Sequence, residues 1–150
     1  MDDLQQANPT DKLALGRRPG HLIWRAQQRA WRAFMEESAA FDITPVQAAV
    51  LLVVSNQPGI DQKSVASVIA LDRATTGNVI GRLEARGLVS RKVEPTDRRA
   101  RALHLTPAGK TLNRKLGTVT RRARRRLMEG LTAHEQAEFT RLLRKLNGLA

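Results

Sequence analysis

Cysteine and tyrosine are absent from the 150-residue sequence, and the other aromatic residues are few, with three phenylalanines and two tryptophans. The lack of cysteine excludes disulfides, thiolate metal sites and cysteine-based redox sensing within this chain. The scarcity of aromatic rings argues against a single-strand nucleic-acid binder, because such proteins stack bases on aromatic side chains. No apolar run approaches the roughly 18–20 residues of a membrane-spanning helix. The polar N-terminus does not resemble a signal peptide, so we expect a cytoplasmic protein without membrane association.

Positive charge is what the sequence has in excess. Lysine and arginine number 26 against 14 aspartates and glutamates, a net charge of +12. Such an excess favours a polyanionic partner, because cations that neutralise phosphates release condensed counterions. A merely soluble basic protein is the other interpretation. The length corresponds to one ordinary domain with a real core.

Capping residues and helix breakers divide the first third of the chain. We expect a flexible leader over residues 1–18 and, from the apolar spacing, a helix over 20–38. The sequence TPVQ at 44–47 combines an N-cap, a proline at the first helical position and a capping-box glutamine. The helix that follows, over about 45–56, is apolar nearly all round and therefore belongs at the centre of the domain.

Two short helices and a hairpin are predicted next. Asp61 can cap a helix over 62–69, and Asp72 can cap another that Gly87 terminates. The short connection between them indicates a helix-turn-helix. Strand-like segments at 88–93 and 100–105, joined by Pro95-Thr96-Asp97, then form a wing. We expect the inner side of the first short helix to consist of Val65, Val68 and Ile69.

Two longer helices complete the predicted architecture. Thr106-Pro107 opens one that continues to about Glu129. The capping box at 132–135 begins the last one. We expect this last helix to bury four apolar residues, namely Phe139, Leu142, Leu143 and Leu146.

The second helix of the helix-turn-helix has the composition of a DNA-recognition helix. Val79, Ile80 and Leu83 fall on one side and anchor it. Threonine can meet a thymine methyl group, asparagine can pair with adenine, and arginine can hold phosphate or guanine. An ordinary solvated helix face is the alternative. The candidate DNA contacts, expected to face away from the anchoring side, are Arg73, Thr75, Thr76, Asn78, Arg82 and Arg86.

The hairpin is rich in arginine, which suits the narrow minor groove of DNA. Arg91 lies on the first strand, and Arg98 and Arg99 lie at the turn. Asp97 is unexpected beside phosphates. We expect it to pair with a nearby arginine, Arg99, and so to fix the shape of the wing.

The stretch from Leu71 to Gly109 closely resembles the MarR (multiple antibiotic resistance regulator) family of winged-helix transcription factors. The matching pieces are Leu71-Asp72, the segment LEARGLVSR, the wing residues 97–99 and the segment LTPAG. With the TPVQ helix and the flanking helices, the likeness covers about residues 19–146. Each motif is weak alone, but together they are specific.

The resemblance implies a mainly α fold: a winged helix-turn-helix with a two-stranded wing, flanked by N- and C-terminal helices that form a dimerisation domain. A single domain would span residues 19–150, with the DNA-binding part at about 44–106 and the dimerisation helices at about 20–38 and 107–148. It also implies a homodimer that binds a pseudo-palindromic operator in double-stranded DNA, usually as a repressor that a small ligand releases. Asp97 and Arg99 would be the family's wing pair. Leu142, Leu143 and Leu146 fit either the dimer interface or the core of one chain.

The first predicted helix carries a candidate effector site. Family members often bind aromatic carboxylates, phenolic compounds or their coenzyme A thioesters. His21, Trp24 and Arg25 share one helix face, and Gln28 extends the row. A ring to stack on and a guanidinium fork suit an aromatic acid. Ordinary packing by Trp24 and a surface role for Arg25 remain the alternative.

No catalytic or metal-binding pattern is recognisable. The three histidines are isolated in sequence, and there is no phosphate loop, nucleophile elbow or paired-carboxylate site. We therefore expect neither an enzyme nor a bound cofactor.

The arginine-rich segment 121–126 needs an acidic partner, either Glu36, Glu37 or Asp42, DNA, or an anionic ligand. A non-specific architectural DNA-binding protein is the alternative to a ligand-responsive repressor.

Overall fold

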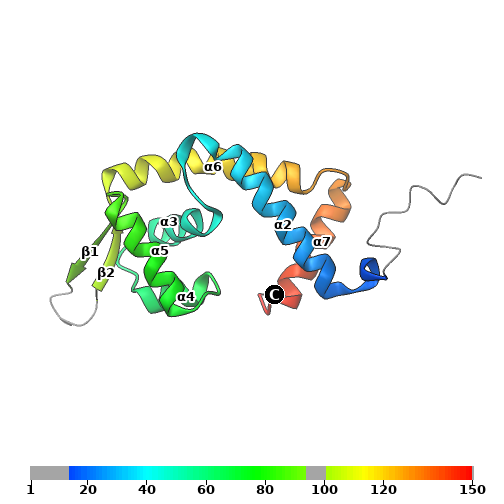
Figure 1. The fold of residues 1–150 in the computed structure, drawn as a ribbon, viewed down its shortest axis with the longest axis horizontal. Coiled ribbons are helices and arrows are strands. Elements are labelled where there is room, and N and C mark those ends of the chain that lie inside the picture. Colours follow the sequence, from blue (N-terminus) through cyan, green and yellow to red (C-terminus); the bar gives the residue numbers. More distant parts are fainter. Residues whose placement is uncertain (1–13, 94–100, 150) are drawn as a thin grey trace, which may run out of the picture. The chain divides into compact units, whose positions relative to one another are not determined.

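The computed structural model describes residues 14–93 and 101–149 (Figure 1). Most of the expected leader and the wing turn with Asp97, Arg98 and Arg99 lie outside the described residues. The predicted fold class, mainly α with a two-stranded wing, is confirmed. In chain order the elements are η1 (Leu15–Arg17), α2 (Pro19–Glu37), η2 (Ala39–Phe41), α3 (Pro45–Asn56), α4 (Gln62–Val68), α5 (Arg73–Ala85), β1 (Val89–Val93), β2 (Arg101–Leu105), α6 (Pro107–Leu127) and α7 (Ala133–Leu146).

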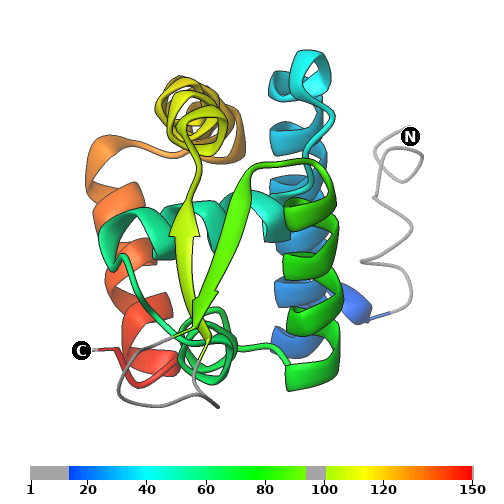
Figure 2. The ribbon, with the colours of Figure 1, turned by 90° about the vertical axis from the view of Figure 1, so that its left-hand side faces the viewer.

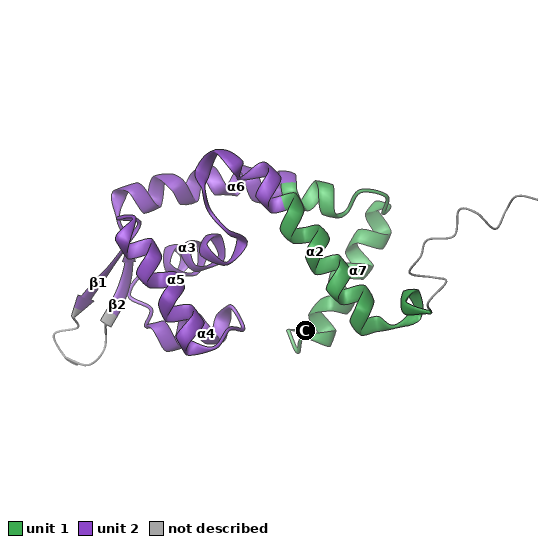
Figure 3. Cartoon of the chain, viewed as in Figure 1, with its two compact units in different colours: residues 1–33, 123–150 green, residues 34–122 purple. Residues whose placement is uncertain are grey.

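The chain forms two compact units (Figure 3). One comprises residues 34–122, and the other comprises 1–33 together with 123–150. Both boundaries fall inside helices, α2 and α6, where the sequence has no linker composition. Because no proline- or glycine-rich linker marks these boundaries, the two units could not be predicted from the sequence.

The unit 34–122 contains the helix-turn-helix and the main core. The predicted capping box starts α3: the Gln47 amide donates to Thr44 Oγ1 at 3.2 Å, and the Thr44 amide donates to Gln47 Oε1 at 3.0 Å. The prediction that Val68 faces inward is wrong, because its side chain is 62% exposed and Ala66 takes the inner position. Among the described residues, the largest fully buried apolar side chains are Ile43, Val50, Leu51, Val54, Val65, Ile80, Leu83 and Leu103.

The antiparallel hairpin β1–β2 is tied to the loop after α3. Val89 pairs with Leu105 and Arg91 with Leu103. The Gly59 amide donates to the Leu103 carbonyl at 2.8 Å, and the Leu103 amide donates to the Ile60 carbonyl at 3.0 Å. Two backbone hydrogen bonds thus hold β2 beside the α3–α4 connection. Figure 2 shows this hairpin from in front, with α5 beside β1.

The LTPAG segment explains how the wing returns to the core. The Thr106 amide donates to the Leu88 carbonyl at 3.1 Å, and its hydroxyl donates to the Gly87 carbonyl at 2.6 Å. A Cβ atom at Gly109 would lie 2.0 Å from the Leu88 carbonyl oxygen. Only glycine therefore allows α6 to begin this close to the chain that leaves α5.

The unit formed by residues 1–33 and 123–150 buries little of its apolar surface. Its helices are joined by polar links: the Arg29 guanidinium donates to the carbonyls of Arg126 at 3.3 Å and Glu129 at 3.1 Å. The prediction that α7 buries Leu142 and Leu146 is wrong within one chain, since these side chains are 49% and 67% exposed. Phe139 and Leu143 are half-buried. Nothing in the described part of this unit covers the outer face of α7.

Candidate nucleic-acid interface and effector pocket

Asp72 fixes the start of α5, the second helix of the helix-turn-helix. Its Oδ1 accepts the Thr75 amide at 2.8 Å, and its Oδ2 accepts the Thr75 hydroxyl at 2.6 Å. These bonds, with the hydroxyl the larger cause, lower the pKa of Asp72 below its ordinary value of 3.8. Asp61 caps α4 in the same way through the Ser64 amide and hydroxyl, and its pKa is also lowered.

The outer face of α5 presents polar side chains to solvent. Arg73, Thr75, Asn78 and Arg82 are exposed, as expected for a helix that approaches another molecule. The placement of Thr76 on this face is wrong. Its side chain is fully buried, and its hydroxyl donates to the Asp72 carbonyl at 2.8 Å. Its position one residue beyond the exposed Thr75 turns it toward the core.

Arg86 is engaged within the protein. Its guanidinium donates to the carbonyls of Phe41, at 3.1 Å, and Asp42. Asp42 has a left-handed backbone, with φ at 46°. The contact ties the end of α5 to the loop that precedes α3, so this arginine positions the helix.

Arg91 also points inward, toward α5 and α4. Its Nε donates to Glu84 Oε2 at 2.8 Å, and its NH1 donates to Gln62 Oε1 at 3.1 Å. The Gln62 amide in turn donates to the Arg73 carbonyl at 3.2 Å. A Cβ atom at Gly77 would lie 2.8 Å from Gln62 Nε2. The roles of Gln62, Glu84 and Gly77 were missed from the sequence.

The alternation of the hairpin could have indicated the direction of Arg91. Residues two apart on a strand share a face, and Val89, two residues before Arg91, is buried against the core. Lys92, the next residue, is exposed. Arg91 is the predicted wing contact that lies within the described residues. Its side chain connects the hairpin to the helix-turn-helix.

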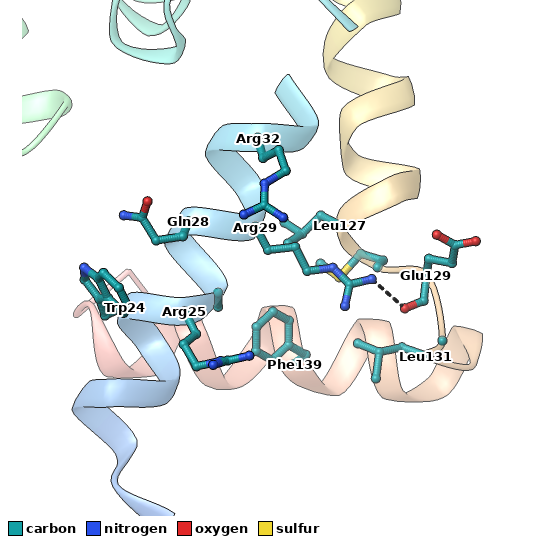
Figure 4. Close-up of a pocket in the computed structure, with 12 residues that line it drawn as sticks. Trp24, Arg25, Gln28, Arg29, Arg32, Leu127, Glu129, Leu131 and Phe139 are labelled. Atoms are coloured by element: carbon teal, nitrogen blue, oxygen red, sulfur yellow. Dashed lines mark hydrogen bonds between the residues drawn. The ribbon is translucent and has the colours of Figure 1, made fainter. Parts of the chain in front are cut away.

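A hollow lies in the unit formed by residues 1–33 and 123–150 (Figure 4). It has a volume of about 820 Å³, and α2 contributes Trp24, Arg25 and Gln28 to its lining. These are three of the four residues predicted to bind an effector. The other lining residues, which sequence reasoning missed, include Arg29, Arg32, Met128, Leu131 and Phe139.

The fourth predicted residue, His21, does not line this hollow. Its ring stacks on Trp24, with the centroids 5.8 Å apart and the planes at 28°. Its Nε2 is buried and has no hydrogen-bond partner among the described residues. His21 therefore stacks beside Trp24 outside the hollow, whereas Trp24, Arg25 and Gln28 line it.

The arginine-rich segment 121–126 acquires one of its expected acidic partners. Arg122 NH1 lies 4.0 Å from Glu37 Oε2, and Arg121 NH2 donates to Thr118 Oγ1 at 2.9 Å. Arg124 and Arg125 are exposed on the same helix. Because the Arg122 side chain is largely exposed, its contact with Glu37 contributes little stability, about 0–1 kcal/mol.

Among the described residues, no helix is long and apolar enough to cross a membrane. No group of three or more histidine, aspartate and glutamate side chains among them could hold a metal ion.

Comparison with known proteins identifies the family. Residues 41–100 match the sequence model of the MarR family. The chain is 30% identical over 127 residues to the HTH-type transcriptional repressor NicR of Pseudomonas putida, and the match covers 85% of this chain and 80% of NicR. The chain belongs to the MarR family.

Solved structures of MarR-family proteins match the same fold. The transcriptional repressor CouR, bound to a 23-mer DNA duplex, is 29% identical with a TM-score of 0.83, and the match covers 89% of this chain and 94% of CouR. BpsR of Bordetella bronchiseptica, whose DNA binding is regulated by 6-hydroxynicotinic acid, is 32% identical with a TM-score of 0.82, covering 87% and 93%. The winged helix of this MarR-family regulator is thus confirmed.

Proposed function

We propose that this protein is a homodimeric, sequence-specific transcriptional repressor in the cytoplasm. It binds a pseudo-palindromic operator and is released by a small aromatic acid, a phenolic compound or a coenzyme A thioester of one. The observation that carries the proposal is the exposed polar face of α5, held by its Asp72 cap and attached to a basic hairpin. We assign the protein no catalytic activity and no cofactor.

The proposed base contacts come from the exposed residues of α5. Thr75 and Asn78 lie in its first half, where a recognition helix meets base edges in the major groove. Arg73 and Arg82 are exposed on the same helix and suit phosphates or guanine. From the sequence, we add Arg98 and Arg99 of the wing as minor-groove contacts, with Asp97 as the partner of Arg99.

The proposed dimer rests on the apolar surface of α2 and α7. Leu22 and Ile23 of α2 are each 47% exposed, and Leu142 and Leu146 of α7 are similarly open. A single chain seldom leaves so many large apolar side chains exposed in one small unit. A second copy of the same helices would cover them, and the two-fold symmetry would match a palindromic operator.

The proposed effector site is the hollow of Figure 4. Trp24 offers a ring to stack on, and Phe139 and Leu131 offer apolar walls. Arg25, beside them, can hold a carboxylate through two parallel hydrogen bonds. An aromatic acid matches this combination, and the BpsR ligand 6-hydroxynicotinic acid is an acid of this kind.

The decisive experiment compares specific with non-specific DNA. Operator sequences would be selected from a random duplex library, and the affinity for the selected duplex would be compared with that for a scrambled one at a fixed salt concentration. We expect a ratio of about 10³ or more. A ratio near one would instead establish a non-specific architectural protein. Sedimentation of the free protein and of the DNA complex would show in parallel whether the protein is a dimer in each.

A further inference from the structure

A basic hollow lies inside the unit 34–122, where the hairpin, the end of α3 and the start of α6 meet, and no residue of α5 lines it. It has a volume of about 390 Å³. Lys92 of β1 and His104 of β2 line it from the hairpin, and Lys110 and Arg114 line it from the first two turns of α6. Four groups that can carry positive charge thus come together from three elements.

No carboxylate lines this hollow within the described residues. Glu84 of α5 is bonded to Arg91 of the hairpin. Arg91 pairs with Leu103, whereas Lys92 pairs with Ala102 and Ser90 with His104, so Arg91 lies on the other face of the hairpin. The positive charges of the hollow are therefore not neutralised by the ion pair that the hairpin makes with α5.

The hollow also offers neutral donors. Ser55 at the end of α3 and Asn113 on α6 are part of its lining, beside an apolar floor that includes Val54. Within the described residues the Arg114 guanidinium makes one hydrogen bond, from NH2 to Thr111 Oγ1 at 3.3 Å, and a guanidinium has five N–H donors. Ammonium, guanidinium, hydroxyl and amide donors around one opening are the groups that bind phosphate oxygens.

We propose that this hollow is a phosphate-binding site, formed by Lys92, His104, Lys110 and Arg114. Its occupant is a phosphate group, supplied either by a small phosphorylated molecule or by the DNA backbone that flanks the bound site. The site is separate from the base-reading face of α5 and from the effector hollow, which lies in the other unit. It does not depend on whether the protein recognises a specific operator.

The first arm of the test uses inorganic pyrophosphate, titrated into the full-length protein in a phosphate-free buffer. Calorimetry gives the affinity, and the side-chain amide resonance of Asn113 reports binding at the hollow. Lys110→Gln/Arg114→Gln removes two cations from the site, and Lys115→Gln/Arg121→Gln removes two exposed cations from the same helix outside it. We expect the first pair to weaken pyrophosphate binding at least about tenfold and the second to leave it unchanged.

The second arm measures binding to a random 40-base-pair duplex as a function of salt, because each protein–phosphate contact adds about 0.9 to the slope of log affinity against log salt. If a DNA phosphate occupies the hollow, the pocket variant lowers this slope by about 0.9 relative to the control variant. Circular dichroism and thermal unfolding of both variants establish that each is folded.

Either selective effect supports the site and identifies the source of the phosphate. A change with pyrophosphate alone assigns a small molecule, and a change in the DNA slope alone assigns the backbone. Equal behaviour of the two variants in both arms would overturn the proposal, because the hollow would then be no different from any other exposed basic surface. This outcome is distinct from failure of the proposed function, which would be seen as equal affinity for selected and scrambled duplexes.

Discussion

Arg91 of β1 and Glu84 of α5 form an ion pair, with Arg91 Nε 2.8 Å from Glu84 Oε2 and both side chains less than one-third exposed. The same guanidinium reaches Gln62, whose amide donates to the Arg73 carbonyl at the start of α5. One arginine therefore links the hairpin to both helices of the helix-turn-helix. Arg91, which the sequence predicts as a DNA contact, thus holds the wing against the recognition helix.

We predict that Arg91→Met and Glu84→Gln each destabilise the protein and that their effects are not additive. A double-mutant cycle in urea should give a coupling of about 0.5–1 kcal/mol, the range for a partly exposed pair. DNA affinity should fall in Arg91→Met with an unchanged salt slope, because no phosphate contact is lost. Arg73→Gln, at an exposed position on α5, is the control and should lower the slope by about 0.9. A lower salt slope in Arg91→Met would instead show that Arg91 contacts a DNA phosphate.

Asn78 is predicted to contribute to base preference. Asn78→Ala should reduce discrimination at one base-pair position of each half-site by about 1–3 kcal/mol, because an amide that pairs with a base edge is removed. The measurement is competition binding with a set of single-substituted duplexes. Thr76→Val provides the contrast: this side chain is buried, so its replacement should lower stability and leave the order of base preferences intact. A uniform loss across all sequences in Asn78→Ala would mark a phosphate contact instead.

The helix-turn-helix could be predicted well because its signals are local. Thr44, Asp61 and Asp72 each cap the helix expected of them, and a cap depends on only four consecutive residues. The inward directions of Thr76 and Arg91 depend on packing between α4, α5 and the hairpin, which local patterns do not specify. For the same reason the exposure of Val68 was missed in a helix too short for a reliable period.

Of the residues that line the hollow of Figure 4, only those of α2 could be predicted from the sequence. Trp24, Arg25 and Gln28 share a helix face, so their spacing brings them together. Phe139 and Leu131 lie more than 100 residues further along the chain and join them through the tertiary fold, for which the sequence contains no short-range sign. For the apolar residues of α7, the sequence predicted burial but not the partner surface. Their helical spacing indicated burial, but it could not say whether one chain or two would provide the cover.

Gly109 is predicted to be intolerant of any side chain. Gly109→Ala should cost about 1–3 kcal/mol or more in unfolding free energy, because the new methyl group would overlap the Leu88 carbonyl and force α6 away from the hairpin. Gly117→Ala is the matched control on the same helix, where the nearest atom, Arg121 NH1, is at 3.8 Å. That change should stabilise the protein by about 0.5–1 kcal/mol through helix propensity. Similar effects of the two changes in urea denaturation would contradict the close approach at Leu88.

The two capping aspartates predict a loss of stability in acid. The pKa values of Asp61 and Asp72 are lowered by hydrogen bonds from Ser64 and Thr75, so the folded state binds fewer protons at these sites than the unfolded state. Their stabilisation is complete above the ordinary pKa of 3.8 and is lost as the pH falls below it through the folded-state values. Asp61→Ser/Asp72→Ser keeps a capping hydroxyl without a titratable group. Its unfolding free energy should therefore fall less steeply with acid than that of the parent, and equal slopes below about pH 4 would exclude this linkage.

Arg25 is predicted to hold the carboxylate of the effector. Benzoic, 4-hydroxybenzoic and 6-hydroxynicotinic acids would be titrated while tryptophan fluorescence is recorded, since Trp24 is 55% exposed at the hollow and the chain has only two tryptophans. In Arg25→Ala we expect the Kd of any acid that binds the parent to rise about tenfold or more, because a charge-assisted pair of hydrogen bonds is lost. Release of DNA by that acid should need correspondingly more ligand, whereas DNA affinity without ligand should not change.

Arg125→Ala is the matched control for this prediction, because Arg125 is an exposed arginine of the same unit that does not line the hollow. General loss of positive charge would weaken acid binding equally in both variants, whereas a carboxylate held at the hollow is affected by Arg25 alone. The alternative interpretation, in which Trp24 packs and Arg25 is a surface charge, requires equal affinities in parent, Arg25→Ala and Arg125→Ala. Failure of all three acids to bind the parent would also count against an aromatic-acid effector. Trp24 and Arg25 would then not bind the ring and the carboxylate of such an acid.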